Sequence, residues 1–292
     1  MGCRIDGCQA EYVRIPFADN GLTKIPNNVT DKNALFVGDI LSSGYFGAEM
    51  CEIKKGDTIA VIGCGPVGLC TMICAKIMGA EKIIAIDTNF PDNNLADCTI
   101  VSDNYLAGMQ CGQHLLAHRS SAHIALLTHQ QAMSAQERID GFRNAIKGKS
   151  EFQVVATEDC LGQLELAMPA MEKILQEHPE VDVVMALNDP AAMGAVAALQ
   201  HAGRLSGTSV YGVDGSPDVK GMIAHGAITA TAGQDPRKIG ILAVESAFRL
   251  LGMKNSLPQR LNIDQYNEQS VIALPTILLT RDNLSQYPNI GY

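Results

Sequence analysis

Short apolar runs alternate with longer amphipathic stretches from about Thr58 to the end of the chain. The runs are rich in β-branched residues, which predicts strands: TIAVIG, KIIAID, HIALLT, FQVVAT, VDVVMAL, SVYGVD, AITATAG and a final SVIALPTILL. Helices are predicted between them, over 66–79, 106–118, 133–146, 162–177, 191–202, 217–225 and 236–251. This alternation is typical of βαβ units, so it predicts an α/β fold with parallel sheets covered by helices.

Other parts of the chain are less regular. The stretch AEYVRIPFADNGLTKIPNNV is rich in turn residues and contains short β-like pieces. It is followed by a partly helical stretch, DKNALFVGDILSSGYFGAEMCEI, in which we expect Asp31 to cap a helix. Asp103 and Asn104 are expected to cap the helix predicted over 106–118. The polar segment TNFPDNNLADC contains a proline and predicts a linker.

Composition and charge narrow the classes of function. A chain of 292 residues has room for two domains with separate cores. The net charge of -9 and the lack of a Lys/Arg cluster argue against nucleic acid as a partner. There is no apolar run of about 18 residues, so we expect no membrane insertion. No export signal opens the sequence, so as written it is expected in the cytoplasm. The nine cysteines include no CxxC pair and are expected to be reduced thiols, not zinc ligands.

One motif points to a nucleotide. Gly63, Gly65 and Gly68 form G-x-G-x-x-G between a predicted strand and a predicted helix. The first glycine permits the tight turn, the second lets the backbone approach a pyrophosphate, and the third lets the helix pack on the strand. Asp87 ends the next predicted strand, where a carboxylate accepts from a ribose 2′-hydroxyl and favours NAD over NADP. The alternative is a βαβ unit that keeps this shape without binding a nucleotide.

The segments GCQAEYVRIPFADNGLTKIP, GDILSSGYFGAE and VIGCGPVGLCTMICAKIMGAEKIIAID resemble the middle of medium-chain zinc-dependent alcohol dehydrogenases. The resemblance covers about residues 1–87. It implies NAD as a possible cofactor, and it places Asp39 at the position of a catalytic zinc ligand. The family's other two ligands, a cysteine and a histidine, have no counterpart here. A catalytic zinc needs three protein ligands, so zinc is not expected to bind. The alternative for Asp39 is an ordinary polar or capping residue.

A second resemblance begins at about residue 83. Its motifs are VSDNYLAG, SAQERIDGF, VVMALNDPAAMGAVAALQHAG, VYGVDGSPD, ITATAGQDPRKIG and LPTILLTRDNL. They resemble the type I periplasmic sugar-binding proteins, which share their core with the ligand domains of LacI-type regulators. The resemblance implies two Rossmann-like parallel-sheet lobes that hold a sugar between them. It also implies an ABC permease as the partner of the intact family, although docking to it is doubtful here because the first lobe is hybrid.

The second resemblance implies five ligand-binding residues: Asp87, Arg138, Asn188, Asp214 and Gln234. Arg138 matches an arginine that binds sugar hydroxyls, and Asn188 matches an asparagine that donates and accepts at once. The other three match two strand-end acids and a hinge glutamine. Four of them have a structural alternative: a surface helix residue for Arg138, a helix cap for Asn188 together with Asp189, a turn residue for Asp214 and a hinge residue for Gln234.

Together, these patterns predict four segments. Residues 1–55 form an irregular, β-containing dehydrogenase-like segment, and 56–100 form a βαβ unit within a hybrid first lobe. Residues 101–233 form an intact sugar-binding lobe, and 234–292 supply the hinge, a returning helix of the first lobe and a last strand. We expect the helix over 236–251 to pack imperfectly on the hybrid sheet through Ile239, Leu242, Val244 and Phe248.

The expected function is non-covalent binding of a monosaccharide or polyol, as the substrate-binding component of an ABC-type sugar transport system. The alternative is an NAD-binding dehydrogenase fragment without activity.

Overall fold

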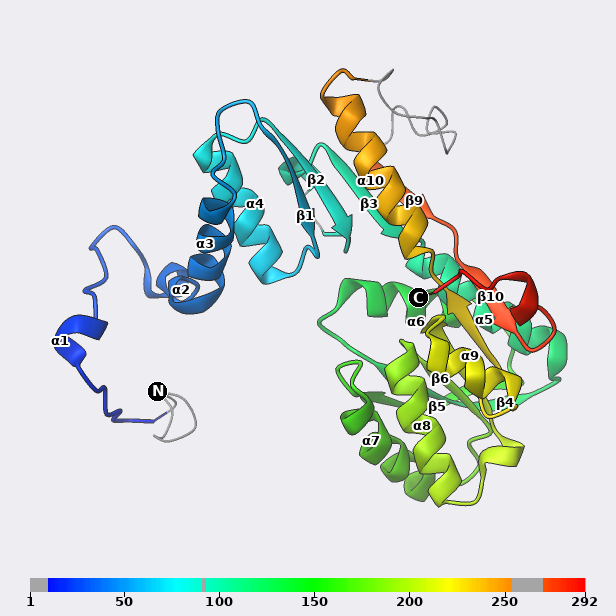
Figure 1. The fold of residues 1–292 in the computed structure, drawn as a ribbon. Helices are drawn as coiled ribbons and strands as arrows, with labels where there is room; N and C mark the ends of the chain where they lie inside the picture. The colour runs from blue at the N-terminus through cyan, green and yellow to red at the C-terminus, as the bar shows by residue number, and fades with distance from the viewer. Residues whose placement is uncertain (1–9, 91–92, 254–269, 292) are drawn as a thin grey trace.

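The computed structural model describes residues 10–90, 93–253 and 270–291, and it contains two α/β lobes, each built on its own sheet (Figure 1). The first sheet has four strands in the order β1-β2-β3-β9, all parallel. Its strands are β1 (Thr58–Ile62), β2 (Lys82–Asp87), β3 (Cys98–Ser102) and β9 (Val271–Leu274). β3 is not among the predicted strands, and it begins at the last residue of the polar segment interpreted as a linker.

The second sheet has six strands in the order β10-β8-β7-β6-β4-β5. Its strands are β4 (Ala122–Thr128), β5 (Phe152–Asp159), β6 (Val183–Ala186), β7 (Ser209–Asp214), β8 (Ala230–Gly233) and β10 (Ile277–Thr280). All neighbours are parallel except β10, which runs antiparallel to β8. The predicted fold class, an α/β protein with two parallel-sheet lobes, is therefore confirmed.

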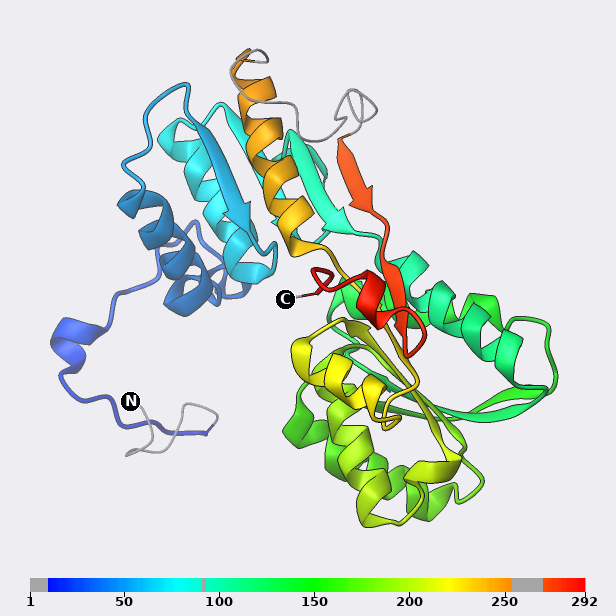
Figure 2. The same cartoon turned by 45° about the vertical axis from the view of Figure 1, so that its right-hand side comes forward.

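The prediction of one final strand, SVIALPTILL, is wrong. This stretch forms β9 in the first sheet and β10 in the second, separated by Pro275 and Thr276. A proline has no N–H to donate to a ladder, so the pairing ends there and the chain crosses to the other lobe. It also crosses between Ser102 and Asn104, and between Gly233 and Pro236. As a result, the carboxyl ends of the parallel strands in the two sheets face each other (Figure 2).

Helices cover both sheets. In the first lobe α4 (Pro66–Met78) and α10 (Pro236–Leu250) pack on the sheet, and α3 (Ser42–Met50) packs against α4. In the second lobe α5 (Asn104–His118) and α6 (Met133–Ala145) cover one face of the sheet, and α7 (Leu164–Glu177), α8 (Asp189–His201) and α9 (Pro217–Ala224) cover the other. Within the described ranges there are also single-turn 3-10 helices, η3 (Asn93–Leu95), η4 (Leu205–Gly207) and η6 (Leu284–Gln286). None of the helices in the described ranges is long and apolar enough to cross a membrane.

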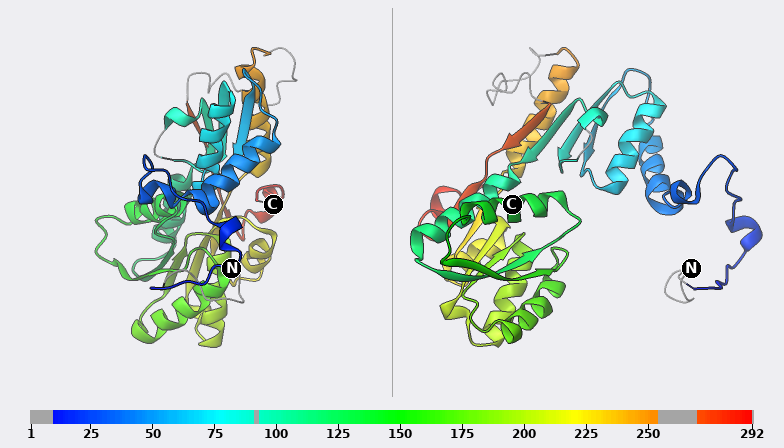
Figure 3. Two further views of the ribbon diagram at one scale, coloured as in Figure 1. Left: turned by 90° about the vertical axis from the view of Figure 1, so that its left-hand side faces the viewer. Right: turned by 180° about the vertical axis from the view of Figure 1, so that it is seen from behind.

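The N-terminal segment contains no strand within residues 10–57, so the expected β-like pieces are not formed. Its elements are α1 (Ala18–Gly21), α2 (Asp31–Ala34) and the π-helix η2 (Val37–Leu41), which leads into α3. A strand needs a neighbouring strand to pair with, and α1 extends away from both lobes (Figure 3). Phe17 there is 86% exposed. The cap of α2 is Thr30, whose hydroxyl accepts from the Asn33 N–H at 3.3 Å, and not Asp31.

α10 packs on the first sheet through part of its expected face. Ile239 and Leu242 are buried against Ile84 and Ile100, whereas Val244 is 52% exposed. Glu245 occupies the buried side instead, and its Oε2 has no hydrogen-bond partner in the described part of the chain. A buried carboxylate oxygen without a partner costs free energy, which agrees with imperfect packing of this helix on the hybrid sheet.

Seven cysteines lie in the described ranges and all are free thiols. Five of them are buried: Cys64, Cys74, Cys98, Cys111 and Cys160. Burial raises the pKa of the Cys111 thiol to about 12, which keeps it protonated and unreactive. Cys3 and Cys8 lie outside the described residues.

Candidate functional site

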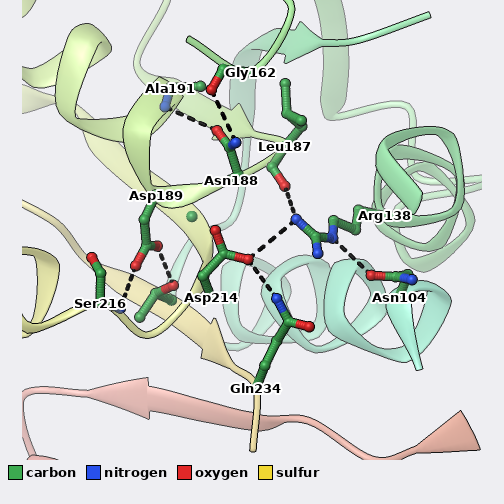
Figure 4. A network of polar contacts seen from close by, with 12 residues as sticks. Asn104, Arg138, Gly162, Leu187, Asn188, Asp189, Ala191, Asp214, Ser216 and Gln234 are labelled. Carbon is green, nitrogen blue, oxygen red and sulfur yellow. Dashed lines mark hydrogen bonds and ion pairs between the residues drawn. The ribbon is translucent and has the colours of Figure 1, made fainter. Parts of the chain in front are cut away.

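Arg138 lies on α6 and is buried, so it is not a surface helix residue. Its Nε donates to Asn104 Oδ1 at 2.9 Å, and its Nη1 donates to the Leu187 carbonyl oxygen at 2.9 Å (Figure 4). Asn104 therefore holds the arginine, whereas Asp103 alone caps α5 by accepting from the Leu106 N–H at 2.8 Å. These contacts fix the guanidinium at the carboxyl end of the six-stranded sheet.

Asp214 ends β7 and faces this guanidinium. Its Oδ1 lies 3.4 Å from Arg138 Nη1 and accepts from Gln234 Nε2 at 2.6 Å. The Gln234 N–H also donates to the Asp214 carbonyl oxygen at 3.0 Å. Burial raises the pKa of Asp214, while the charge of Arg138 and the hydrogen bond from Gln234 oppose that rise. Asp214 has a φ of 132°, a conformation that is costly for a residue with a side chain and that clusters at ligand sites.

Asn188 is the N-cap of α8, as its structural alternative states. Its Oδ1 accepts from the Ala191 N–H at 3.0 Å, and its Nδ2 donates to the Gly162 carbonyl oxygen at 3.0 Å. Both functional groups of the amide are thus engaged within the lobe. A contact between Asn188 and a ligand stays a prediction.

Asp189 is a central polar residue that sequence reasoning did not identify, except as a second possible cap. Its side chain is fully buried and joins three segments. Oδ1 accepts from the Thr231 hydroxyl at 2.6 Å on β8, and Oδ2 accepts from the Ser216 N–H at 2.7 Å in the turn before α9. Burial raises the pKa of Asp189 to about 6. The signal in the sequence was an acid flanked by Asn188 and Pro190 inside an otherwise apolar stretch.

The raised pKa of Asp189 makes stability depend on pH. The folded chain holds this proton more tightly than the unfolded chain, so the stabilisation is complete below the ordinary aspartate pKa of 3.8 and is lost as the pH rises through about 6. We expect the free energy of unfolding to fall by about 2 kcal/mol between pH 4 and pH 7 from this group.

Urea denaturation at a series of pH values measures that decrease. Asp189→Asn has no proton to lose and should show a flatter profile than the native chain. Equal slopes for the two proteins would contradict the assignment.

Asp87 ends β2 of the first lobe and is exposed. It has a φ of 80°, the second strand-end aspartate with a positive φ. Its negative charge contributes to the raised pKa of Asp214, which belongs to the other lobe. Asp214 therefore contacts both Arg138 and Gln234, so three of the five predicted ligand residues lie together, and Asp87 lies at the carboxyl end of a strand of the first sheet.

The glycine turn keeps its expected geometry. Gly63 has a φ of 82°, and a Cβ on Gly68 would lie only 2.0 Å from the Gly63 carbonyl oxygen. Gly65 is the N-cap of α4, which ends at Gly79 with a φ of 116°. A groove of about 530 Å³ runs beside the turn, lined by residues of α3, β1 and α4. The turn therefore keeps the glycine-dependent backbone geometry that its sequence predicts.

Asp39 lies on the exposed π-helix η2, where its Oδ1 accepts from the Ser43 hydroxyl at 3.2 Å. Within the described ranges, no group of three or more His, Cys, Asp or Glu side chains is placed to hold a metal ion. The residues around Asp39 therefore do not fit a catalytic zinc, and no chemical step is assigned to one.

Comparison with known proteins finds both resemblances. A stretch of 89 residues is 51% identical to an alcohol dehydrogenase of Cupriavidus necator, over 30% of this chain and 24% of that enzyme. A stretch of 154 residues is 35% identical to the ribose import binding protein of Escherichia coli, over 52% of this chain and 51% of that protein. The chain thus spans about a quarter of the first relative and about half of the second.

Among solved structures, an ABC transporter periplasmic solute-binding protein of Actinobacillus succinogenes with bound D-allose has the same fold. The TM-score is 0.69, with 22% identity, over 83% of this chain and 85% of that chain. The family model of the periplasmic binding protein domain matches residues 54–255, which include the glycine turn, Arg138, Asp214 and Gln234. The dehydrogenase resemblance covers only 30% of the chain, and its glycine turn lies inside the part that the family model matches. The chain therefore belongs to the periplasmic binding protein domain family.

Proposed function

We propose that this chain binds a monosaccharide or a related polyol, without covalent chemistry, between its two lobes. The observation that carries the proposal is the contact of Arg138, Asp214 and Gln234 at the carboxyl ends of the six-stranded sheet. Ligands of α/β proteins bind at such strand ends. A sugar hydroxyl both donates and accepts, and the trio offers a charged donor, a carboxylate and an amide.

Arg138 and Gln234 also have groups left for a ligand. In the described part of the chain, no hydrogen bond engages Arg138 Nη2 or Gln234 Oε1. One can donate to a hydroxyl and the other can accept from it. In this proposal Asp87, an exposed acid at the carboxyl end of β2, accepts a further hydroxyl from the first lobe. The amide oxygen and nitrogen of Asn188 already make hydrogen bonds within the lobe, so Asn188 contributes less to sugar binding in this proposal.

The relatives support a sugar as the ligand class, because one is a ribose import binding protein and another was solved with bound D-allose. The first lobe begins with a dehydrogenase-like unit, so fewer polar partners reach the sugar from that side. Each hydrogen bond not made costs about 0.5–1.5 kcal/mol, so we expect weaker affinity than in an intact family member. Within an ABC-type transport system, docking to a permease would use both lobes and would be weakened likewise.

A thermal-shift titration tests this function. The panel is D-ribose, D-allose, other pentoses, hexoses and polyols, with NAD, NADP and zinc in separate wells. A sugar at 100 times its dissociation constant is expected to add about 2.7 kcal/mol of stability. Asp214→Asn should abolish the shift, while Asp218→Asn, an exposed acid on α9, should leave it unchanged. A cooperative melting transition whose midpoint temperature is raised by no sugar of the panel would overturn the proposal.

Nucleotide binding is the second candidate, favoured by the preserved geometry of Gly63 and Gly68. Non-enzymatic binding of NAD would place its pyrophosphate at the N-terminus of α4 and its ribose near Asp87. A shift with NAD that Gly65→Val abolishes, and that NADP does not produce, would support this candidate. Equal melting curves with and without NAD would exclude it.

A further inference from the structure

The C-terminal segment, residues 283–291, returns to the carboxyl end of the six-stranded sheet after β10 ends. It begins with η6 and continues through Pro288 to Gly291. This segment lies at the level where the two lobes meet (Figures 1 and 2). Leu284, Tyr287 and Ile290 pack against the core of the second lobe, and Ile290 is buried. The segment is thus a packed part of the fold beside the candidate sugar site.

Polar contacts join this segment to the residues of that site. The Gly291 N–H donates to the Gln234 carbonyl oxygen at 2.6 Å. Lys220 Nζ, on α9, donates to the carbonyl oxygens of Pro288, at 3.3 Å, and Ile290. Gln234 is therefore held from two sides, by the C-terminal segment through its carbonyl and by Asp214 through its N–H and its amide.

Three glycines allow this close approach. A Cβ on Gly291 would lie 1.8 Å from the Gly215 carbonyl oxygen, and a Cβ on Gly233 would lie 2.4 Å from Ile290 Cγ2. Gly215 follows Asp214 directly, and Gly233 precedes Gln234. The C-terminal backbone is thus pressed against the two segments that carry the acid and the amide of the site.

We propose that residues 283–291 are a positioning element of the sugar site, which fixes the backbones of Asp214 and Gln234 so that the carboxylate and the amide meet. This inference rests on the proposed function. The strained φ of 132° at Asp214 supports it, because such a conformation persists only where the surroundings hold it. The alternative for a segment so close to the site is an obstacle that a ligand must displace.

The test compares three variants with the native chain: removal of residues 288–292, Gly291→Val and Gly252→Val. Gly252 is the matched control, since its φ of 72° resembles the 78° of Gly291 but nothing lies within 4 Å of its Cβ position. Calorimetry with D-ribose and D-allose should show at least tenfold weaker binding for the first two variants and no change for the control. Tighter binding after removal would identify the segment as an obstacle and overturn the proposal.

A second readout needs no sugar. Freed from its support, Gln234 should lose its hydrogen bond to Asp214, so the carboxyl pKa of Asp214 should rise in the first two variants. NMR titration of that carboxyl measures this, with Arg138, Asp189 and Asp87 as the charged groups around it. An unchanged titration would overturn the proposal, whether or not a sugar binds. A further outcome is that the native chain binds neither sugar while the pKa of Asp214 still rises in the first two variants. In that case the proposed function fails for these sugars and the positioning role stands.

Discussion

Arg138→Met is expected to lower the free energy of unfolding by about 3 kcal/mol, because it leaves the half-buried Asp214 carboxylate without its cation. The Leu187 carbonyl and Asn104 lose their hydrogen bonds as well. Protonation of Asp214 relieves part of this cost, so the effect should be smaller at pH 4 than at pH 7. Urea denaturation at both pH values measures the change.

Arg143→Met is the matched control for that variant. It lies on the same helix and is exposed, and in the described part of the chain its side chain makes one hydrogen bond, to the Thr157 hydroxyl at 3.3 Å. We expect it to change stability by less than about 0.5 kcal/mol. The double variant Arg138→Met with Asp214→Asn should recover part of the loss. Equal stability of Arg138→Met and Arg143→Met would show that the buried pair contributes nothing.

Gly108→Ala is expected to have an effect of similar size, because α5 and α6 touch through their backbones. A Cβ on Gly108 would lie 1.7 Å from the Arg138 carbonyl oxygen, and one on Gly141 would lie 2.0 Å from that of Tyr105. Neither helix backbone can yield without separating the pair, and overpacking of this kind costs about 3 kcal/mol. The shift would also displace Arg138, so sugar affinity should fall with stability.

Gly221→Ala is the control for Gly108→Ala. Gly221 lies within α9, is exposed, and has nothing within 4 Å of its Cβ position. Replacing a helical glycine by alanine at such a site stabilises by about 0.5–1 kcal/mol. Thermal melts of the two variants should therefore move in opposite directions. If the melting temperature of Gly108→Ala equals or exceeds that of the native chain, then α5 and α6 can move apart without a loss of stability.

Local patterns predicted the elements well, since strands and helices depend first on neighbours in the sequence. The helix ending at Gly79 and the cap at Asp103 follow from one or two residues each. The same reasoning failed where pairing is distant. Nothing local distinguishes β3 from a loop, because its strand character comes from pairing with β2 and β9. Likewise, β9 and β10 are one apolar run that two different sheets divide between them.

In the candidate site, too, some features follow from the local sequence and others depend on contacts between distant residues. Residue type and resemblance pointed to Arg138, Asp214 and Gln234, but Arg138 and Asp214 are 76 positions apart along the chain. Their meeting depends on α6 and β7 converging at one end of a sheet, which no local pattern encodes. Asp189 was missed because its role is defined by Thr231 and Ser216, which are near it only in the folded lobe.

By itself, the sequence determined the α/β class, the dehydrogenase-like start, the sugar-binding-like remainder and the glycine turn, because each is written in contiguous residues. The tertiary structure decided which polar groups are engaged and which are left for a ligand. It buried Arg138 beside Asp214, turned Asn188 into a helix cap and placed Gly291 against Gly215. Burial and hydrogen bonding are properties of groups brought together from distant parts of the chain, so only the folded lobes could settle them.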